Sequence, residues 1–226
     1  ASGLSLLGKK SLILDLDPQG NSTSGLGIDK SLLNKSIYNV LLGELSLYES
    51  FKTIDLNNNK KITISPSVGD LSGADIELYS IEDREWILKK ALSSSSLDNY
   101  DYILIDCPPS LSLLTINAFT AADSLLIPVQ CEFFAMEGLA QLNKTIELII
   151  SRLNPSLEIE GLLLTMYDSR NNICKTVASE VKEFFKEKVL KTLIPKNVKL
   201  AESPSFGKCI FDYDSECLGA ISYLNL

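Results

Sequence analysis

The sequence predicts a three-layer α/β protein, in which a mostly parallel, twisted sheet carries helices on both faces. Short apolar runs alternate along the chain with segments of helical periodicity, a pattern typical of parallel strands that helices cover on both sides. Composition agrees, because 45% of the residues are hydrophobic and 22% are charged, enough to bury a substantial core. The length of 226 residues suits one domain over residues 1–226.

The expected strands are short runs rich in Leu, Ile and Val. They lie at 11–16, 61–65, 101–106, 123–129, 159–165 and 189–194. Between them, apolar residues recur at helical spacing. We expect helices near 71–80, 83–95, 111–122, 135–153, 174–187 and 215–225.

Three carboxylates lie at or just past the ends of these strands. Asp15 and Asp17 end the apolar run in "SLILDLDPQGNST", and Asp106 ends the one in "YDYILID". Ligands of open α/β sheets bind beyond the carboxyl ends of the strands. A single Asp there is most often a turn former or a helix cap, but three at one edge favour a metal site. Mg²⁺ suits such a place because it takes few carboxylates and keeps several waters.

The composition also excludes several classes of protein. Histidine is absent, which excludes Ser-His-Asp and Cys-His catalysis and HExxH metal sites. The five cysteines form no CxxC pair, as expected of reduced intracellular thiols. No apolar run reaches the roughly 18 residues of a membrane span, and no signal segment opens the chain, so we expect a cytoplasmic protein. The net charge of −8 leaves room only for a local basic patch.

Four segments, in this order, closely resemble the ParA/Soj-type chromosome and plasmid partition ATPases, deviant-Walker relatives of MinD. They are "LLGKKSLILDLDPQGNSTSGLGID", "YDYILIDCPPSLSLLTINAFTAADSLLIPVQCEFFAMEGLAQL", "GLLLTMYDSRNN" and "IPKNVKLAESPSFGK". The resemblance runs from residue 1 to about residue 225 and is weakest over 45–95. It implies a P-loop NTPase-like fold that binds ATP or ADP with Mg²⁺. It also implies a nucleoid-associated homodimer that binds DNA non-specifically, with ATP hydrolysis stimulated by a ParB-like protein on a centromere-like site.

The resemblance implies roles for the three carboxylates. Asp17 aligns with the catalytic aspartate that positions the attacking water on the γ-phosphate. Asp15 lies on the metal side of the same loop, and Asp106 matches the Walker B aspartate that holds Mg²⁺ through water. Phosphoryl transfer needs charge neutralisation and an oriented water more than a strong base. A chain without histidine can therefore perform it.

The resemblance also places the contacts to the adenine. Pro195 and Asn197, in "IPKN", fall where the family contacts the base, with Thr165 and Met166 near that pocket. By itself, the "IPKN" motif is better explained as the exit of a strand into a loop. The aromatic pair in "QCEFFAMEGL" also matches the family, and we interpret it as packing or dimer contacts.

Two departures from the family pattern stand out. No GK[ST] phosphate loop occurs in the 226 residues, although backbone N–H groups and lysines of such a loop cradle the phosphates. Residues 1–10 resemble the last turns of the helix that should follow that loop, with Gly8 at its stop position. We therefore expect the natural protein to begin earlier with a KGGxGKT-like loop, and the chain as written to lack a central strand and ATPase activity. Near the other end, Glu216 and Leu218 stand where relatives usually place cations.

The segment 181–200 is the basic patch of this acidic chain. It holds six lysines and two glutamates, a net charge of +4 within a chain of −8. We expect Lys186, Lys188 and Lys191 to contact DNA phosphates. The alternative is a solvated amphipathic helix and its loop.

Three other functions remain as alternatives. A non-catalytic relative could use the same fold only for dimerisation or scaffolding, and the missing phosphate loop favours it. A HAD-type phosphatase would use Asp15 as nucleophile and Asp17 as acid/base, but its DxD motif normally continues into Gly-Thr rather than Pro18-Gln19. A MinD-like membrane ATPase would need a basic amphipathic C-terminal helix, and "AISYLNL" carries no cation.

Overall fold

The computed structural model describes residues 1–94 and 97–226, which divide into two units. Unit 1 comprises residues 1–122 and 202–213, and unit 2 comprises residues 123–201 and 214–226. Among the described residues, the strands form a four-stranded sheet in the order β2-β3-β1-β4 and a two-stranded sheet of β5 and β6. Each unit thus carries its own sheet.

Unit 1 holds seventeen of the helices and strands described here. They are α1 (Ser2–Leu6), β1 (Ser11–Asp15), α2 (Asn21–Gly25), the 3₁₀ helix η1 (Lys30–Leu32), α3 (Ile37–Leu41), η2 (Leu47–Ser50), β2 (Lys52–Leu56), η3 (Asn57–Asn59), β3 (Lys60–Ser65), η4 (Gly69–Gly73), α4 (Ala74–Leu78), η5 (Arg84–Trp86), α5 (Ile87–Ser93), β4 (Tyr102–Asp106), α6 (Leu113–Ala121), η7 (Ser203–Phe206) and α10 (Ile210–Tyr213).

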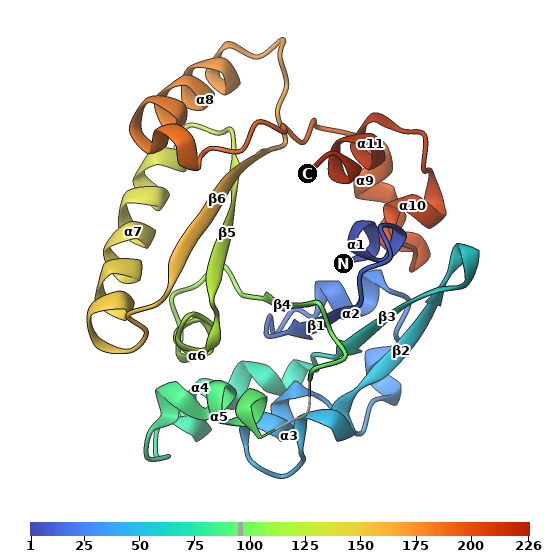
Figure 1. Ribbon diagram of the computed structural model, residues 1–226, viewed down its shortest axis with the longest axis vertical. Helices are drawn as coiled ribbons and strands as arrows, with labels where there is room; N and C mark the ends of the chain where they lie inside the picture. Colours follow the sequence, from blue (N-terminus) through green and yellow to red (C-terminus); the bar gives the residue numbers. More distant parts are fainter. Residues whose placement is uncertain (95–96) are drawn as a thin grey trace. The chain divides into compact units, whose positions relative to one another are not determined.

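The centre of the unit 1 sheet is parallel and buried. Strand β1 pairs in parallel with β3 on one side and with β4 on the other, whereas β2 runs antiparallel to β3 at the edge. Every residue of β1 is buried, because neighbouring strands pair with both edges of a central strand and helices cover both faces of a parallel sheet. Figure 1 shows α3, α4 and α5 on one side of this sheet and α1 on the other.

Hydrogen bonds from buried polar groups fasten the helices of unit 1. Asn117 of α6 is fully buried, and its side-chain amide accepts from the Leu88 amide at 3.1 Å and donates to the Arg84 carbonyl at 2.8 Å. On the other side of the sheet, the Ser5 hydroxyl of α1 donates to the Lys61 carbonyl of β3 at 3.2 Å. A buried polar group without such a partner would be costly.

Unit 2 is built from two parallel strands and amphipathic helices. Its elements are β5 (Ser124–Gln130), α7 (Ala135–Arg152), β6 (Glu158–Thr165), α8 (Asn172–Phe185), η6 (Lys186–Lys188) and α11 (Leu218–Leu224), and α9 (Val198–Glu202) ends where unit 1 resumes. Helix α7 lies along the two strands, and α8 lies above α7 in the view of Figure 1. In α7 the buried residues Leu139, Ile146 and Ile149 are spaced as one helical face. Within residues 1–94 and 97–226, no helix is both long and apolar enough to cross a membrane.

The fold class agrees with the prediction from sequence, an α/β protein with a mostly parallel sheet. Five expected strands are confirmed as β1, β3, β4, β5 and β6. The expected helices near 111–122, 135–153, 174–187 and 215–225 correspond to α6, α7, α8 and α11, and that near 71–80 begins as the 3₁₀ helix η4. The helix expected over 83–95 corresponds to η5 and α5, and its last residue lies outside the described residues.

The strand expected at 189–194 is wrong. This segment makes only isolated bridges, although the Leu190 and Ile194 amides donate to the carbonyls of Leu162 and Leu164 at 2.9 Å each. The two donors, Leu190 and Ile194, are four positions apart, whereas their acceptors on β6 are only two positions apart. This difference in spacing prevents a continuous ladder. Conversely, the edge strand β2 was not predicted, because most of its residues are exposed or only partly buried and it lacks a buried apolar run.

Candidate active site

The site centres on the loop that connects β1 to α2. After Asp15 the chain turns through Asp17 to Gly20, whose left-handed φ of 59° precedes the first residue of α2. A side chain on Gly20 would meet the Ser67 Cβ atom at 3.4 Å and the Lys30 side chain at 3.0 Å. The Lys30 ammonium group donates to the Gln19 carbonyl at 2.5 Å. The left-handed φ angle favours glycine at this position.

Asp15 is an internal hydrogen-bond acceptor. It is fully buried, and its Oδ2 atom accepts from the Thr23 hydroxyl at 2.6 Å and from the Thr23 amide at 2.8 Å. Its Oδ1 atom accepts from the Asp17 amide at 3.3 Å. Burial raises the pKa of Asp15, while the hydrogen bonds from Thr23 act to lower it. The carboxylate thus anchors the first turn of α2 to the end of β1.

Asp106 lies beside Asp15 in the sheet. The register of β1 and β4 places the two residues opposite one another, and the Ser22 hydroxyl donates to Asp106 Oδ2 at 2.6 Å. The pKa of Asp106 is raised, first by burial and then by the negative charge of Asp17, and the bond from Ser22 opposes the rise. Two carboxylates that repel one another in a partly buried site favour a bound cation.

The oxygen atoms of Asp106 and Ser22 fit Mg²⁺, which prefers hard oxygen ligands. In the described part of the chain, no three His, Cys, Asp or Glu side chains gather closely enough to hold a metal ion by themselves. Mg²⁺ in nucleotide sites is commonly bound by one or two carboxylates together with phosphates and water. The residues present suit that mode and not a cage built from the protein alone.

Asp17 is half-buried and shapes its own loop. Its Oδ1 atom accepts from the Gln19 amide at 2.9 Å, and its carbonyl accepts from the Gly20 amide at 2.8 Å. The Ser67 hydroxyl, from the segment that follows β3, donates to the same carbonyl at 2.7 Å. These bonds hold the carbonyl group and one carboxylate oxygen of Asp17 in place.

Cys107 follows Asp106 and has no sign of reactivity. Its thiol is free, and burial together with the charge of Asp106 raises its pKa to about 12. Because the thiolate and not the thiol is the nucleophile, Cys107 is a packing residue beside the site.

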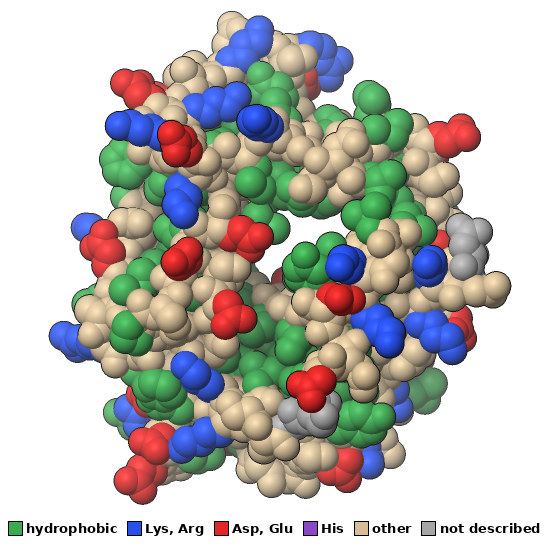
Figure 2. Space-filling view, viewed as in Figure 1, with side chains coloured by type: hydrophobic (Ala, Val, Ile, Leu, Met, Phe, Trp, Pro, Cys, Tyr) green, Lys and Arg blue, Asp and Glu red, His purple; other side chains and the backbone are tan. Residues whose placement is uncertain are grey.

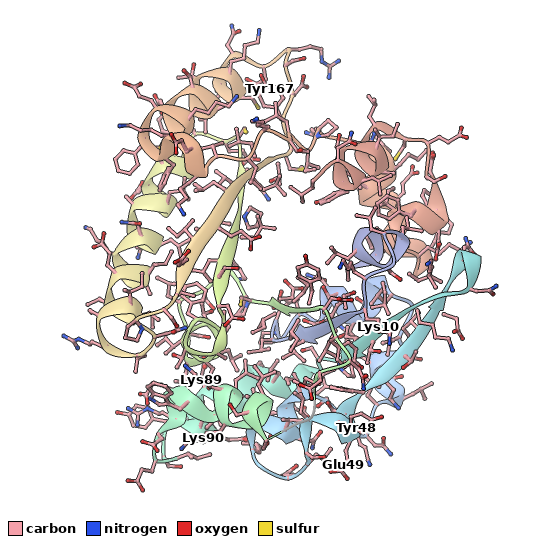
Figure 3. The ribbon with its side chains drawn as sticks, viewed as in Figure 1. Lys10, Tyr48, Glu49, Lys89, Lys90 and Tyr167 are labelled. Carbon is pink, nitrogen blue, oxygen red and sulfur yellow. The ribbon has the colours of Figure 1, made fainter. Side chains whose placement is uncertain are left out.

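In unit 2 the structure brings together the four residues assigned to the adenine. Thr165 ends β6, and Met166 follows it with a left-handed φ of 53° and 43% of its surface exposed. Tyr167, at the end of this strand (Figure 3), forms an isolated bridge with Pro195. The Asn197 Oδ1 atom accepts from the Leu200 amide at 3.2 Å, and its side-chain NH₂ group has no hydrogen bond among those described.

The lysines of the basic segment differ in their surroundings. Lys186 follows the last residue of α8 and begins η6, with a positive φ of 48°, and Lys191 is exposed in the irregular segment after η6. The Lys188 ammonium group instead donates to the Ile159 carbonyl at 2.7 Å. Figure 2 shows Lys and Arg side chains over the α8 region with acidic side chains among them.

Three hydroxyl residues of the site were not predicted from the sequence. Ser22 and Thr23 could have been noticed, because hydroxyl side chains in "GNST" directly follow the DxD loop at a helix start. Ser67 could not, since it lies 50 residues from Asp17 in sequence and only the pairing of β1 with β3 brings it close.

Comparisons with known proteins agree on the family. The family model described as an AAA domain matches residues 1–159. The chain is 49% identical to the sporulation initiation inhibitor protein Soj of Bacillus subtilis, over 99% of this chain and 87% of that protein. It is 47% identical to the chromosome partitioning protein ParA of Myxococcus xanthus, over 100% of this chain and 78% of that protein.

Among solved structures, cobyrinic acid a,c-diamide synthase from Mycobacterium smegmatis, with bound ADP and magnesium, superposes with a TM-score of 0.84. The two chains are 34% identical, over 99% of this chain and 82% of that chain. The family model and the sequence relatives agree, and the chain belongs to the AAA domain family and, within it, to the Soj/ParA chromosome-partitioning ATPases.

Proposed function

We propose that this protein is a Mg²⁺-dependent ATPase that partitions DNA. The observation that carries the proposal is the pair Asp17 and Asp106 at the carboxyl ends of β1 and β4, with Ser22 bonded to Asp106 at 2.6 Å. Mg²⁺, when bound, neutralises charge on the β- and γ-phosphates of ATP. The relatives named as chromosome partitioning proteins support the cellular role.

Each residue of the site has a distinct task in this proposal. The carboxylate of Asp17 orients the attacking water, since Oδ1 is held by the Gln19 amide and Oδ2 has no such bond among those described. Asp106 holds the metal through water, with its carboxylate oriented by Ser22. Asp15 anchors the loop and α2. Such pre-orientation is the main contribution a protein makes to phosphoryl transfer.

We further propose that Thr165, Met166, Pro195 and Asn197 contact the adenine. The support is their proximity around the bridge between Tyr167 and Pro195. The Asn197 NH₂ group could donate to a ring nitrogen of the base, and the exposed Met166 side chain offers an apolar surface beside it.

The remaining parts of the proposal concern partners. ATP drives homodimerisation, and the exposed rings of Phe133 and Phe134, 74% and 71% accessible, suit a contact between subunits. The dimer binds DNA non-specifically through Lys186, Lys188 and Lys191, and a ParB-like centromere-binding protein stimulates hydrolysis. The protein acts in the cytoplasm on the nucleoid, and its DNA cargo is a chromosome or a plasmid.

The test is an ATPase and dimerisation assay on the natural protein and its Asp17→Ala variant. We expect hydrolysis to fall by at least about 100-fold, because the water is no longer positioned, while ATP-dependent dimerisation persists. Asp55→Ala is the matched control, since Asp55 is an exposed residue of β2 whose carboxylate lies 3.3 Å from the Lys61 ammonium group. Turnover by Asp17→Ala at the parental rate would show that Asp17 does not position the water.

Two alternatives make different predictions. A scaffolding relative would dimerise without any ATP turnover in either variant. A HAD-type phosphatase would form an aspartyl-phosphate on Asp15, which trapping and mass spectrometry would detect. The complete burial of Asp15 and its bonds to Thr23 speak against a nucleophile at that position.

The phosphate loop stays a prediction. No GK[ST] occurs in the 226 residues, and residues 2–6 form the short helix α1, followed by Gly8 with a φ of 81°. Reading the coding sequence upstream of Ala1 tests the expectation of a KGGxGKT-like loop. Its presence would explain how the phosphates are held, and its absence would favour the scaffolding alternative.

A further inference from the structure

Ser67 contacts the Asp17 loop at two separate places. It is fully buried in the segment after β3, and its hydroxyl donates to the Asp17 carbonyl at 2.7 Å. Its backbone amide donates to the Thr23 hydroxyl at 2.9 Å, and that hydroxyl in turn donates to Asp15 at 2.6 Å. Ser67, in the segment that follows β3, is therefore bonded to both ends of the segment 17–23, at Asp17 and at Thr23.

Around Asp17 itself, the other described bonds of the loop are local, from the Gln19 and Gly20 amides to Asp17. The bonds that tie the loop to the rest of the unit lie further along it, from Lys30 to the Gln19 carbonyl and from the Ser22 hydroxyl to Asp106. Local bonds preserve the shape of a turn but do not set its position in the molecule. The Ser67 Cβ atom also lies 3.4 Å from where a Gly20 side chain would begin, so Ser67 packs against the turn as well.

We propose that Ser67 is a positioning residue, which sets the place of the Asp17 carboxylate by holding the Asp17 carbonyl. The proposal rests on the proposed ATPase function, in which Asp17 orients a water. A displacement of about 1 Å in such a site can reduce turnover by about 100-fold. Ser67 itself touches no reacting atom in this proposal.

The chain offers a matched control two residues away. Ser65 is also fully buried, but its hydroxyl is bonded to the Ser50 hydroxyl at 2.6 Å. Ser65→Ala and Ser67→Ala each remove one buried hydroxyl from the same stretch. A merely structural role of Ser67 would make the two variants behave alike.

The experiment compares these variants in the natural protein by three measurements: thermal unfolding, kcat and KM for ATP, and hydrogen–deuterium exchange without nucleotide. For Ser67→Ala we expect kcat to fall roughly 10- to 100-fold with KM changed less than about twofold. The Gln19 and Gly20 amides should exchange about tenfold faster. Ser65→Ala should lower the melting temperature comparably and leave kcat and these two amides unchanged.

Ser67→Cys is a second variant in case Ser67→Ala does not fold, because the thiol keeps the size of the side chain but is a weak donor. It should give the same changes at smaller amplitude. Equal effects of the Ser65 and Ser67 variants, or unchanged exchange of Gln19 and Gly20, would overturn the proposal. If the parent protein hydrolyses no ATP, the proposed function fails, while the exchange comparison still decides whether Ser67 positions the loop.

Discussion

The hydroxyl of Thr23 donates to the carboxylate of Asp15 at 2.6 Å, and both side chains are fully buried. The Thr23 amide adds a second bond at 2.8 Å. This pair joins the carboxyl end of β1 to the first turn of α2, a helix of five residues that is too short to be stable alone. The buried carboxylate thus organises the site before any ligand binds.

Thr23→Val should destabilise the protein by roughly 1–3 kcal/mol, because a buried carboxylate loses a hydroxyl donor and the Ser67 amide loses its acceptor. Chemical denaturation measures the change. Thr23→Ser keeps the hydroxyl and removes one methyl group, so it should cost no more than about 1 kcal/mol. Equal losses in the two variants would mean that packing of the methyl group, not the hydrogen bond, explains the role of Thr23.

Asp106→Asn should weaken nucleotide binding only when Mg²⁺ is present. Asparagine retains an acceptor for the Ser22 hydroxyl, now 2.6 Å from the carboxylate, but it removes the negative charge that attracts the metal. Titration of a fluorescent ATP analogue with and without Mg²⁺ measures the effect, which we expect to be at least about tenfold. A parent protein that binds ATP equally well with and without Mg²⁺ would contradict the metal role of Asp106.

Lys186→Ala with Lys191→Ala should reduce affinity for non-specific DNA and its dependence on salt. The slope of log K against log salt is negative, and each lost phosphate contact reduces its magnitude by about 0.9. Lys188→Ala should have the smaller effect on DNA, because its ammonium group is already bonded to the Ile159 carbonyl at 2.7 Å. DNA binding measured at several salt concentrations distinguishes the double variant from Lys188→Ala. If alanine at all three positions, 186, 188 and 191, left the affinity at low salt unchanged, the DNA site would lie elsewhere.

The ion pair between Asp168 and Arg170 should give a stability that depends on pH. Two bonds of 3.0 and 2.8 Å from the guanidinium group lower the pKa of Asp168 to about 2. Because the folded pKa lies below the unfolded value of about 3.9, the stabilisation is present above pH 4 and is lost as the pH falls toward 2. Asp168→Asn should thus lower the melting temperature at pH 7 but not near pH 2.

That effect should be small, because Arg170 is exposed and Asp168 only partly covered, so that water and salt screen the pair. Thermal unfolding at both pH values, at low and high salt, provides the measurement. If the difference in melting temperature between the parent and Asp168→Asn were the same at pH 2 and at pH 7, the ion pair would not contribute to stability.

The sequence alone determined the α/β class and most of the strands, since a buried parallel strand must be almost wholly apolar wherever it packs. It also located Asp15, Asp17 and Asp106 at strand ends, because the end of an apolar run marks the edge of the sheet. The position of Pro195 near Thr165 and Met166 came from the family resemblance and not from the pattern of the chain, and the isolated bridge between Tyr167 and Pro195 lies just past the end of β6.

Only the tertiary structure decided what these residues contact. The pattern of apolar residues could not show that the segment 189–194 pairs too irregularly with β6 to form a strand. Its two hydrogen bonds to β6 are four positions apart in this segment but only two positions apart in β6. Nor could it distinguish the buried Asp15, with its oxygens on Thr23 and Asp17, from the half-buried Asp17 two positions later. Ser67 lies 50 residues from Asp17, and the pairing of β3 with β1 brings them together, because hydrogen bonds between strands depend on register and not on distance along the chain.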